Sequence, residues 1–294
     1  MRVLLHEWID PELLGELPEE VELLPAGRFA EAEVVVDPRD DLLRHLREIS
    51  GLTTVLVTSA GTDWIEPHVP PGVTLANARG ARDAAVAEWV VAAVLAMEKE
   101  LFVEREWQRK RDWSARRALP DVEGRAALIL GAGSIGGAVQ DRLEPFGVTT
   151  MLVARTQREG VRSADDLHAL LPHAEILIVL LPLTSATRGL VDARALSLLP
   201  DGALVVNAGR GAVVDTDALL AELKAKRLRA ALDVVEPEPL PSDHPLWKAP
   251  GTFISPHVSG DSVRADEAAV RLMGEQLRRL AWGAPLRNVV DRGG

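Results

Sequence analysis

The chain has 294 residues, 47% of them hydrophobic and 26% charged, which is typical of a globular protein of about two domains. Lysine and arginine number 33 against 44 acidic residues, and the net charge of −11 argues against general binding to nucleic acid or to an anionic membrane, since both require a basic face. The sequence contains no cysteine, which excludes disulfides, thiolate catalysis and cysteine-ligated metal clusters. The first apolar run is too short for a signal peptide, and no run reaches the ~18 residues of a transmembrane helix, so we expect a cytoplasmic protein.

The first part of the chain alternates short apolar runs with a helical pattern. The expected strands are Val3–Leu5, Val21–Leu24, Val34–Val36, Thr54–Thr58 and Val73–Leu75, and Asp40–Ile49 is the expected helix. From Asp83 to about Arg111 there is neither glycine nor proline, and apolar residues recur at helical spacing from Val86 to Leu101. This stretch therefore predicts one long helix.

A second series of strands and helices follows. The expected strands are Ala126–Leu130, Thr149–Val153, Ile176–Leu181, Ala203–Asn207, Ala230–Asp233 and Phe253–Ser255. The expected helices are Ile135–Phe146, Ser163–Leu171, Asp192–Leu199, Thr216–Lys226 and Asp261–Trp282. Ser163 is expected to cap its helix with Asp166 as its reciprocal partner. Strands that alternate with helices in this way predict an α/β protein with two doubly wound, parallel-stranded domains.

A glycine-rich segment, Gly131-Ala132-Gly133-Ser134-Ile135-Gly136, follows the expected strand Ala126–Leu130 and begins the next helix. In this context the first glycine permits a tight turn, the second lets a pyrophosphate approach the backbone, and the third lets the helix pack closely on the strand. The N–H groups at the start of the helix would bind the phosphates. The segment predicts a dinucleotide site, and the alternative is a glycine-rich turn without a ligand.

The residues after the second strand of this series indicate which dinucleotide binds. NAD enzymes place Asp or Glu here to accept a hydrogen bond from the ribose 2′-hydroxyl, but this strand is followed by Arg155, Thr156, Gln157 and Arg158. Guanidinium groups bind a 2′-phosphate, which a carboxylate would repel. Arg155, Thr156 and Arg158 therefore favour NADP, and NAD is the alternative if the arginines are only solvated surface charges.

Polar residues follow three later strands, at the edge where open α/β sheets bind their ligands. These segments are Asn207–Gly211, Asp233–Pro239 and Ser255–Gly260. They supply an arginine, Arg210, a carboxylate, Glu238, and a histidine, His257, whose side chain can gain and lose a proton near neutral pH. Taken singly, each has a structural alternative: a surface ion pair for the arginine, a loop charge for the carboxylate and a packing role for the histidine.

These segments resemble the motifs of the D-isomer-specific 2-hydroxyacid dehydrogenases. Asn207–Asp215 is similar to that family's NxxRG…VD motif, Asp233–Pro239 to its DVFxxEP motif, with Val235 at the usual aromatic position, and Pro256–Gly260 to its PHxxG motif. Further similarities are the LPLTxxT pattern that begins at Leu181-Pro182, the turn Ser59-Ala60-Gly61, and the spacing of Asn77 and Glu88. The resemblance covers nearly the whole chain.

The resemblance implies a site for hydride transfer. His257 would donate the proton to the substrate carbonyl, Glu238 would pair with His257, and Arg210 would polarise the oxo group and bind the α-carboxylate. The Glu-Pro pair that ends the family motif selects Glu238 over Glu236, which lies in the same loop. Further carboxylate contacts would come from the turn Ser59, Ala60 and Gly61. The implied cofactor contacts are Gly131, Gly133, Ser134, Ile135, Gly136, Arg155, Thr156, Arg158, Leu181, Pro182, Asn207, Ala208, Gly209, Asp233, Ser259 and Gly260. Of these, Asp233 would meet the nicotinamide carboxamide.

On this resemblance the chain would transfer a hydride between NADP(H) and a small 2-oxo or 2-hydroxy acid, with D stereospecificity. Arg155–Arg158 and His244–Trp247 are similar to the branch that reduces glyoxylate and hydroxypyruvate. The first alternative is an NAD-dependent phosphoglycerate-type dehydrogenase, which needs a further cation such as Arg39. A formate dehydrogenase fits less well, because that branch pairs its histidine with glutamine. The other alternative is a non-catalytic, cofactor-sensing interaction protein of the same fold, against which the intact catalytic residues argue.

The resemblance also implies how domains and subunits are arranged. A smaller substrate domain of flavodoxin-like fold, residues 1–81 and 260–294, would be interrupted by a Rossmann cofactor domain, residues 82–259. The long helix from Asp83 would contribute to a homodimer interface, unless its apolar stripe packs within one subunit. Trp247 would either cover a neighbouring active site or anchor the proline-rich loop that precedes it. The histidines and acids lack metal-ligand spacing, so we expect no metal site.

Overall fold

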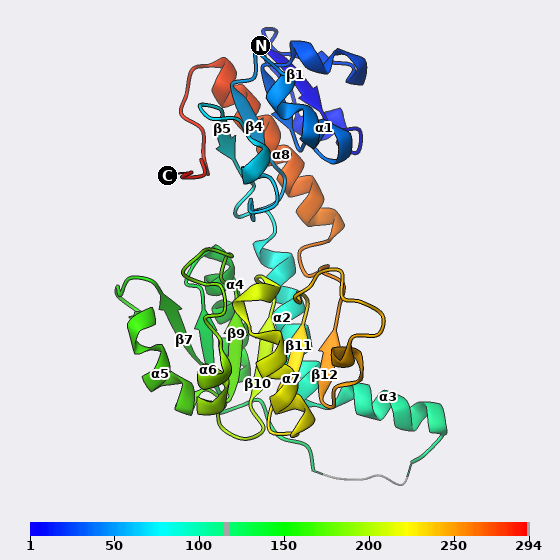
Figure 1. Cartoon of the computed structure of the whole chain (residues 1–294), viewed down its shortest axis with the longest axis vertical. Helices are drawn as coiled ribbons and strands as arrows, with labels where there is room; N and C mark the ends of the chain where they lie inside the picture. The colour runs from blue at the N-terminus through cyan, green and yellow to red at the C-terminus, as the bar shows by residue number, and fades with distance from the viewer. Residues whose placement is uncertain (114–117, 293–294) are drawn as a thin grey trace. The chain divides into compact units, whose positions relative to one another are not determined.

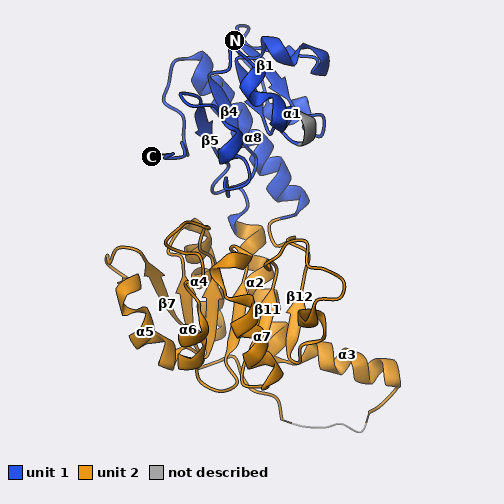
Figure 2. Ribbon diagram, viewed as in Figure 1, with its two compact units in different colours: residues 1–83, 261–294 blue, residues 84–260 orange. Residues whose placement is uncertain are grey.

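The computed structural model describes residues 1–113 and 118–292, without the side chains of residues 40 and 41. The chain forms two compact units: unit 1 comprises Met1–Asp83 and Asp261–Gly294, and unit 2 comprises Ala84–Gly260 (Figure 2). Unit 1 is therefore interrupted in the sequence by unit 2. From the sequence, these divisions are expected after residues 81 and 259. Within the described residues, no helix is both long and apolar enough to cross a membrane.

Unit 1 is built on a five-stranded sheet in which all neighbouring strands are parallel. In spatial order its strands are β2 (Glu22–Leu24), β1 (Arg2–Leu5), β3 (Val34–Val36), β4 (Thr54–Leu56) and β5 (Thr74–Ala76). Helix α8 (Val263–Ala281) packs on one face, and α1 (Asp40–His45) packs on the other with the 3₁₀ helices Ala26–Glu31 and Leu46–Glu48. This strand order is that of a doubly wound fold, which confirms the predicted fold class.

The segment after α8 returns to the edge of this sheet. Val289 pairs antiparallel with Ala76, and the N–H of Val290 donates to the carbonyl oxygen of Leu75 at 2.8 Å. Gln276, a fully buried residue of α8, holds the same segment, because its side chain exchanges hydrogen bonds of 2.6 and 3.0 Å with the backbone of Arg287. The C-terminal segment is thus fixed beside β5.

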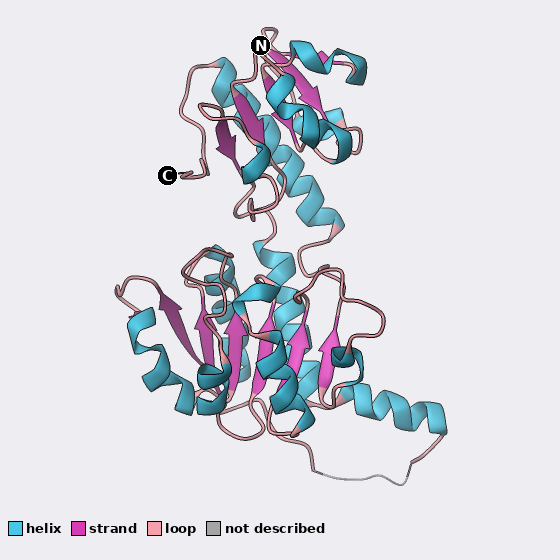
Figure 3. Cartoon of the chain, in the orientation of Figure 1, coloured by secondary structure: helices cyan, strands magenta, loops and turns pink. Residues whose placement is uncertain are grey.

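Unit 2 is built on a seven-stranded parallel sheet. In spatial order its strands are β12 (Thr252–Ile254), β11 (Arg229–Leu232), β10 (Leu204–Asn207), β9 (Ile176–Val179), β6 (Ala126–Leu130), β7 (Thr149–Ala154) and β8 (Val161–Ser163). Helices α2 (Asp83–Glu98) and α4 (Ser134–Leu143) cover one face, and α5 (Leu167–Leu170), α6 (Ala193–Leu198) and α7 (Thr216–Lys224) cover the other (Figure 3). Every residue of the central strand β9 is buried, as expected for a strand covered on both faces.

The single helix expected over residues 83–111 is wrong. The structure has two helices there, α2 and α3 (Leu101–Lys110). Glu100 lies between them in a left-handed backbone conformation with φ of 49°, through which a right-handed helix cannot continue. Glu98, at the end of α2, is fully buried and forms ion pairs of 2.7 and 3.2 Å with two arginines, Arg229 and Arg125. Helix α3 buries none of its residues and runs away from the sheet (Figure 1), so the apolar spacing does not mark one continuous core face.

Smaller differences concern element ends. Strand β8 is absent from the expected elements, and it forms after a tight turn in which Arg158 and Val161 exchange backbone hydrogen bonds. Ser163 is a cap, as predicted, but it accepts the N–H of Asp165 at 3.2 Å and does not pair with Asp166. The strand expected over 176–181 ends at residue 179, so Leu181 and Pro182 lie in the loop that follows.

Candidate active site

Most of the residues singled out in the sequence follow strands of unit 2. Because these strands are all parallel, their carboxyl ends share one edge of the sheet (Figure 1). The direction in which successive strands are added reverses between β6 and β9. Ligands of doubly wound sheets bind at such a reversal. The loops after β6, β9, β10, β11 and β12 therefore form the candidate site.

The loop after β6 has the geometry that a pyrophosphate requires. Gly131 has φ of +119°, and a Cβ there would lie 2.9 Å from the carbonyl oxygen of Leu180. A Cβ on Gly136 would overlap the carbonyl oxygen of Gly131, so only glycine lets α4 begin so close to the strand. Gly133 is exposed with open space beside it, and no described side chain caps α4. The first N–H groups of α4 are therefore open to a phosphate.

The residues predicted to select NADP lie beside this loop. Arg155, Thr156 and Arg158 follow β7 and are exposed. The guanidinium of Arg158 donates a hydrogen bond of 2.6 Å to the carbonyl oxygen of Ala132, within the glycine-rich segment. Its backbone is fixed by the pairing with Val161. A cation is thus held next to the glycine loop, on the side of β7.

The turn after β10 presents Arg210. The side chain of Asn207, which is 1% exposed, closes this turn: it accepts the N–H of Gly209 at 3.1 Å and donates to the carbonyl oxygen of Arg210 at 3.1 Å. Gly209 packs on the loop after β9, where a Cβ would lie 2.7 Å from the carbonyl oxygen of Leu181. The guanidinium of Arg210 is partly buried and donates to the carbonyl oxygen of Gly209 at 2.9 Å. The structure thus brings the Asn207–Arg210 turn beside Leu181 and Pro182.

Asp233 organises the loop that carries His257. Its carboxylate is 1% exposed and accepts hydrogen bonds from the hydroxyl of Ser255 at 2.6 Å, the N–H of Val258 at 2.9 Å and the N–H of Ser259 at 2.8 Å. The N–H of His257 donates to the carbonyl oxygen of Asp233 at 2.8 Å. The carboxylate therefore binds its own chain, and its contact with a nicotinamide carboxamide stays a prediction.

His257 and Glu238 lie in direct contact. Nδ1 of the imidazole is 2.5 Å from Oε1 of the carboxylate. The backbone of His257 is left-handed, with φ of +54°, a conformation uncommon for a residue with a side chain. The two side chains are 45% and 37% exposed, so the pair lies at the surface of unit 2. Glu236, the alternative partner, is exposed and forms no hydrogen bond or ion pair with the histidine among the described residues.

The proline-rich loop that carries Glu238 is held at two points. The hydroxyl of Thr216 donates to the carbonyl oxygen of Glu236 at 3.1 Å, and the indole N–H of Trp247 donates to the carbonyl oxygen of Pro241 at 2.8 Å. Trp247 therefore anchors the loop, which is one of the two roles expected for it, although its side chain stays 49% exposed.

The turn predicted to bind a carboxylate, Ser59–Gly61, lies in unit 1 after β4. Each of its carbonyl groups accepts a hydrogen bond from within the unit. The donors are the N–H of Ala78 to Ser59 at 3.0 Å, the side chain of Asn77 to Ala60 at 2.8 Å, and the indole of Trp64 to Gly61 at 3.1 Å. Within the described residues, no group accepts the N–H of Ala60 or Gly61. Neighbouring N–H groups left open in a turn form an anion-binding arrangement.

The sequence does not predict the roles of Trp64, Asn77 and Ser255. Two signals mark Asn77: its spacing to Glu88, which resembles a family pattern, and its place directly after a strand, where an amide side chain commonly hydrogen-bonds nearby backbone. Ser255 likewise follows β12, but nothing in the sequence pairs it with the distant Asp233. These side chains bind groups that lie elsewhere in the sequence, and the sequence does not show those contacts.

Comparison with known proteins matches much of the chain to the family whose motifs the sequence resembles. The family described as "D-isomer specific 2-hydroxyacid dehydrogenase, NAD binding domain" matches residues 91–259. Glyoxylate/hydroxypyruvate reductase A of Salmonella newport (strain SL254) is 36% identical over 170 residues, which are 56% of this chain and 54% of that relative. The chloroplastic/mitochondrial formate dehydrogenase of Arabidopsis thaliana is 28% identical over 266 residues, which are 85% of this chain and 69% of that relative.

A solved structure resembles the chain over both units. The NADPH-dependent glyoxylate/hydroxypyruvate reductase from Sinorhizobium meliloti, in complex with NADP and sulfate, has a TM-score of 0.86 and 26% sequence identity. The alignment covers 99% of this chain and 98% of that one.

Proposed function

Because the chain belongs to the D-isomer specific 2-hydroxyacid dehydrogenases, a family of oxidoreductases, we propose that it reduces glyoxylate, hydroxypyruvate or a similarly small 2-oxo acid to the D-2-hydroxy acid with NADPH. The observation that carries the proposal is the contact of 2.5 Å between Nδ1 of His257 and Oε1 of Glu238. A carboxylate on one ring nitrogen orients the imidazole and leaves Nε2 to exchange a proton with the substrate.

The residues of unit 2 fit a dinucleotide. Gly133 and the uncapped start of α4 would hold its pyrophosphate, and Leu181 with Gly209 would line the nicotinamide end of the same edge. When bound, the nicotinamide supplies the hydride. Arg155, Thr156 and Arg158 support NADP over NAD, because a guanidinium beside the glycine loop binds a 2′-phosphate and the residue directly after β7 is Arg155, not a carboxylate.

Residues of the chain supply the proton for the reduction and bind the charged carboxylate of the substrate. His257 donates its proton to the carbonyl oxygen, and Glu238 balances the positive charge of the imidazolium. Arg210 offers a planar set of donors suited to the oxo group and an α-carboxylate. The open N–H groups of Ala60 and Gly61 bind carboxylate oxygen.

A substrate and cofactor panel tests this proposal. Oxidation of NADPH and NADH is followed with glyoxylate, hydroxypyruvate and longer 2-oxo acids, and reduction of NAD⁺ is followed with formate. We expect the highest kcat/KM for NADPH with a small 2-oxo acid, and no turnover of formate, because Glu238 stands where the formate branch has glutamine. Binding of NADPH without turnover of any 2-oxo acid would instead favour the non-catalytic, cofactor-sensing alternative.

One observation keeps a phosphoglycerate-type dehydrogenase as a second candidate. Arg39 follows β3, where its Nε donates to the buried carboxylate of Asp37 at 2.7 Å and its guanidinium lies 5.5 Å from the ring centroid of Trp8. With His6 and His45 it lines a cavity at the carboxyl end of β1. The guanidinium of Arg39 is a suitable phosphate ligand, and a carboxylate, that of Glu7, lines the same cavity. NAD-dependent oxidation of 3-phosphoglycerate with a higher kcat/KM than glyoxylate reduction would establish this candidate.

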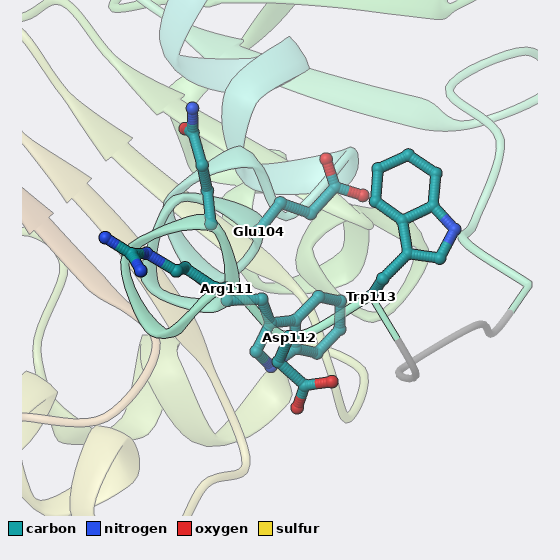
Figure 4. Close-up of a pocket in the computed structure, with 6 residues that line it drawn as sticks. Glu104, Arg111, Asp112 and Trp113 are labelled. Atoms are coloured by element: carbon teal, nitrogen blue, oxygen red, sulfur yellow. The ribbon is translucent and has the colours of Figure 1, made fainter.

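We also propose a homodimer formed through α3. The helix exposes Leu101, Phe102 and Val103 by 50%, 42% and 43%, and exposed groups of large apolar residues mark interfaces. A hollow at the C-terminal end of α3 is lined by Trp107 and Trp113 and by the polar residues Glu104, Gln108, Arg111 and Asp112 (Figure 4). Light scattering should give twice the mass of one chain, and Leu101→Asp should shift the protein toward the monomer. A wild type of single-chain mass would refute the dimer.

A further inference from the structure

We propose that Asn77 is a positioning residue: its side chain orients the N–H of Gly61 toward the substrate carboxylate. Asn288 of the C-terminal segment holds Asn77 in place by hydrogen bonds. This inference rests on the proposed function, because it takes Ser59–Gly61 as the turn that binds the substrate carboxylate. It extends the binding machinery to a residue that is 211 positions away from Asn77 in the sequence.

The side chain of Asn77 joins the end of β5 to the turn. Its amide Nδ2 donates to the carbonyl oxygen of Ala60 at 2.8 Å. That carbonyl and the N–H of Gly61 belong to the same planar trans peptide, in which they point to opposite sides. Fixing the carbonyl oxygen of Ala60 therefore fixes the direction in which the Gly61 N–H points.

The clamp on Asn77 leaves its side chain little freedom. Oδ1 accepts the N–H of Arg79 at 3.1 Å, so both ends of the amide are bound. The backbone N–H of Asn77 donates to the carbonyl oxygen of Asn288 at 3.1 Å, and its carbonyl oxygen accepts Nδ2 of Asn288 at 3.3 Å. The same Nδ2 donates to the carbonyl oxygen of Arg79 at 2.9 Å. Asn288 thus binds both the backbone N–H and the backbone carbonyl oxygen of Asn77.

The C-terminal segment is anchored independently of Asn77, which supplies a control. The guanidinium of Arg292 donates to the carbonyl oxygens of Val69, Pro70 and Val73 at 2.7, 3.3 and 2.9 Å. These bonds hold the segment to the same unit without touching the turn or Asn77. Removing the Arg292 side chain should therefore weaken the attachment of the segment without changing the direction of the Gly61 N–H.

The test compares Asn77→Ala, Asn288→Gly and Arg292→Ala in the full chain. Glycine is chosen at 288 because the residue has φ of +53°, which glycine adopts without strain. For each variant we measure kcat and KM with NADPH and glyoxylate, the Kd of oxamate by calorimetry in the presence of NADPH, and Tm. We expect KM for glyoxylate and Kd for oxamate to rise about tenfold in the two asparagine variants, the factor expected when one charge-assisted hydrogen bond is misaligned. KM for NADPH should not change, kcat should fall by less than about threefold, and Arg292→Ala should lower only Tm.

Two results would overturn the positioning role. One is a pair of asparagine variants that lose Tm as Arg292→Ala does but keep the wild-type KM and Kd. The other is an equal fall in kcat and in the affinity for every ligand, which would indicate general disorder. If the wild type reduces no 2-oxo acid, the proposed function fails and the oxamate Kd still decides the positioning role. A wild type that neither reduces a 2-oxo acid nor binds oxamate overturns both.

Discussion

Oε1 of Glu238 lies 2.5 Å from Nδ1 of His257, whereas Glu236, in the same loop, forms no hydrogen bond or ion pair with the imidazole among the described residues. Of these two carboxylates, Glu238 therefore binds His257, the proposed proton donor, and Glu236 does not. Thr216 and Trp247 hold the backbone of this loop at Glu236 and Pro241.

Glu238→Gln should lower kcat for the best 2-oxo acid by roughly 10²-fold, because the amide cannot balance the charge of the imidazolium. Glu236→Gln removes the same charge from the same loop and should leave kcat within about twofold of the wild type. Steady-state rates with NADPH check both. An equal effect of the two substitutions would show that only the net charge of the loop matters.

Arg158→Ala should shift cofactor preference toward NADH. The guanidinium beside Ala132 would form charge-assisted bonds with the 2′-phosphate, each contributing roughly 1.5–3 kcal/mol, so the ratio of kcat/KM for NADPH over NADH should fall about tenfold or more. Arg162→Ala is the matched control, since this exposed arginine lies on β8. If Arg158→Ala leaves this ratio unchanged, Arg158 does not bind the 2′-phosphate.

Two adjacent glycines of α4 should respond in opposite directions to alanine. A Cβ at Gly136 would overlap the carbonyl oxygen of Gly131, so Gly136→Ala should destabilise unit 2 by about 1–3 kcal/mol or more and raise KM for NADPH. Gly137 has no atom within 4 Å of such a Cβ and lies within the helix, so Gly137→Ala should stabilise by up to about 1 kcal/mol. Urea unfolding of both variants checks the sign of each effect.

The stability of unit 1 should depend on pH through Glu33. The backbone N–H of Arg2 donates to its carboxylate at 2.7 Å, and with the nearby guanidinium it lowers the pKa of Glu33 below its usual value of 4.5. A carboxyl whose folded pKa is lowered contributes stability above the unfolded pKa and loses it as the pH falls through the folded pKa. Glu33→Gln should therefore lower the urea midpoint at pH 7, and the difference from the wild type should shrink as the pH falls from 4.5 through the folded pKa of Glu33. A difference that is constant with pH would show that charge is not the cause.

The fold and the order of the site residues could be predicted because they rest on local patterns. The glycine segment works through φ angles and close approach at Gly131 and Gly136, which only glycine permits, so the residues themselves mark the turn. Buried runs such as β9 mark strands for the same reason. Loops that follow parallel strands must share an edge, which brings Arg210 and His257 to the same side of the sheet.

What could not be predicted depends on contacts between distant residues. The break after α2 lies two residues beyond Glu98, which is buried against Arg125 and Arg229, and nothing near Glu98 in the sequence shows these partners. The roles of Asn77 and Asn288 depend likewise on backbone carbonyls, which every residue possesses. Apolar residues continue at helical spacing across Glu100, but Leu101, Phe102 and Val103 of α3 are exposed, so the spacing does not mark a core face there.

The central claim is that His257 is the proton donor of an NADPH-dependent 2-oxo acid reductase. The most direct measurement is kcat/KM for glyoxylate with NADPH in His257→Ala, with His244→Ala as a control, since the ring of His244 caps a short helix by accepting the N–H of Leu246. We predict a loss of roughly 10²- to 10⁴-fold in His257→Ala with an unchanged Kd for NADPH, and near wild-type turnover in His244→Ala. Unchanged turnover in His257→Ala would contradict the account.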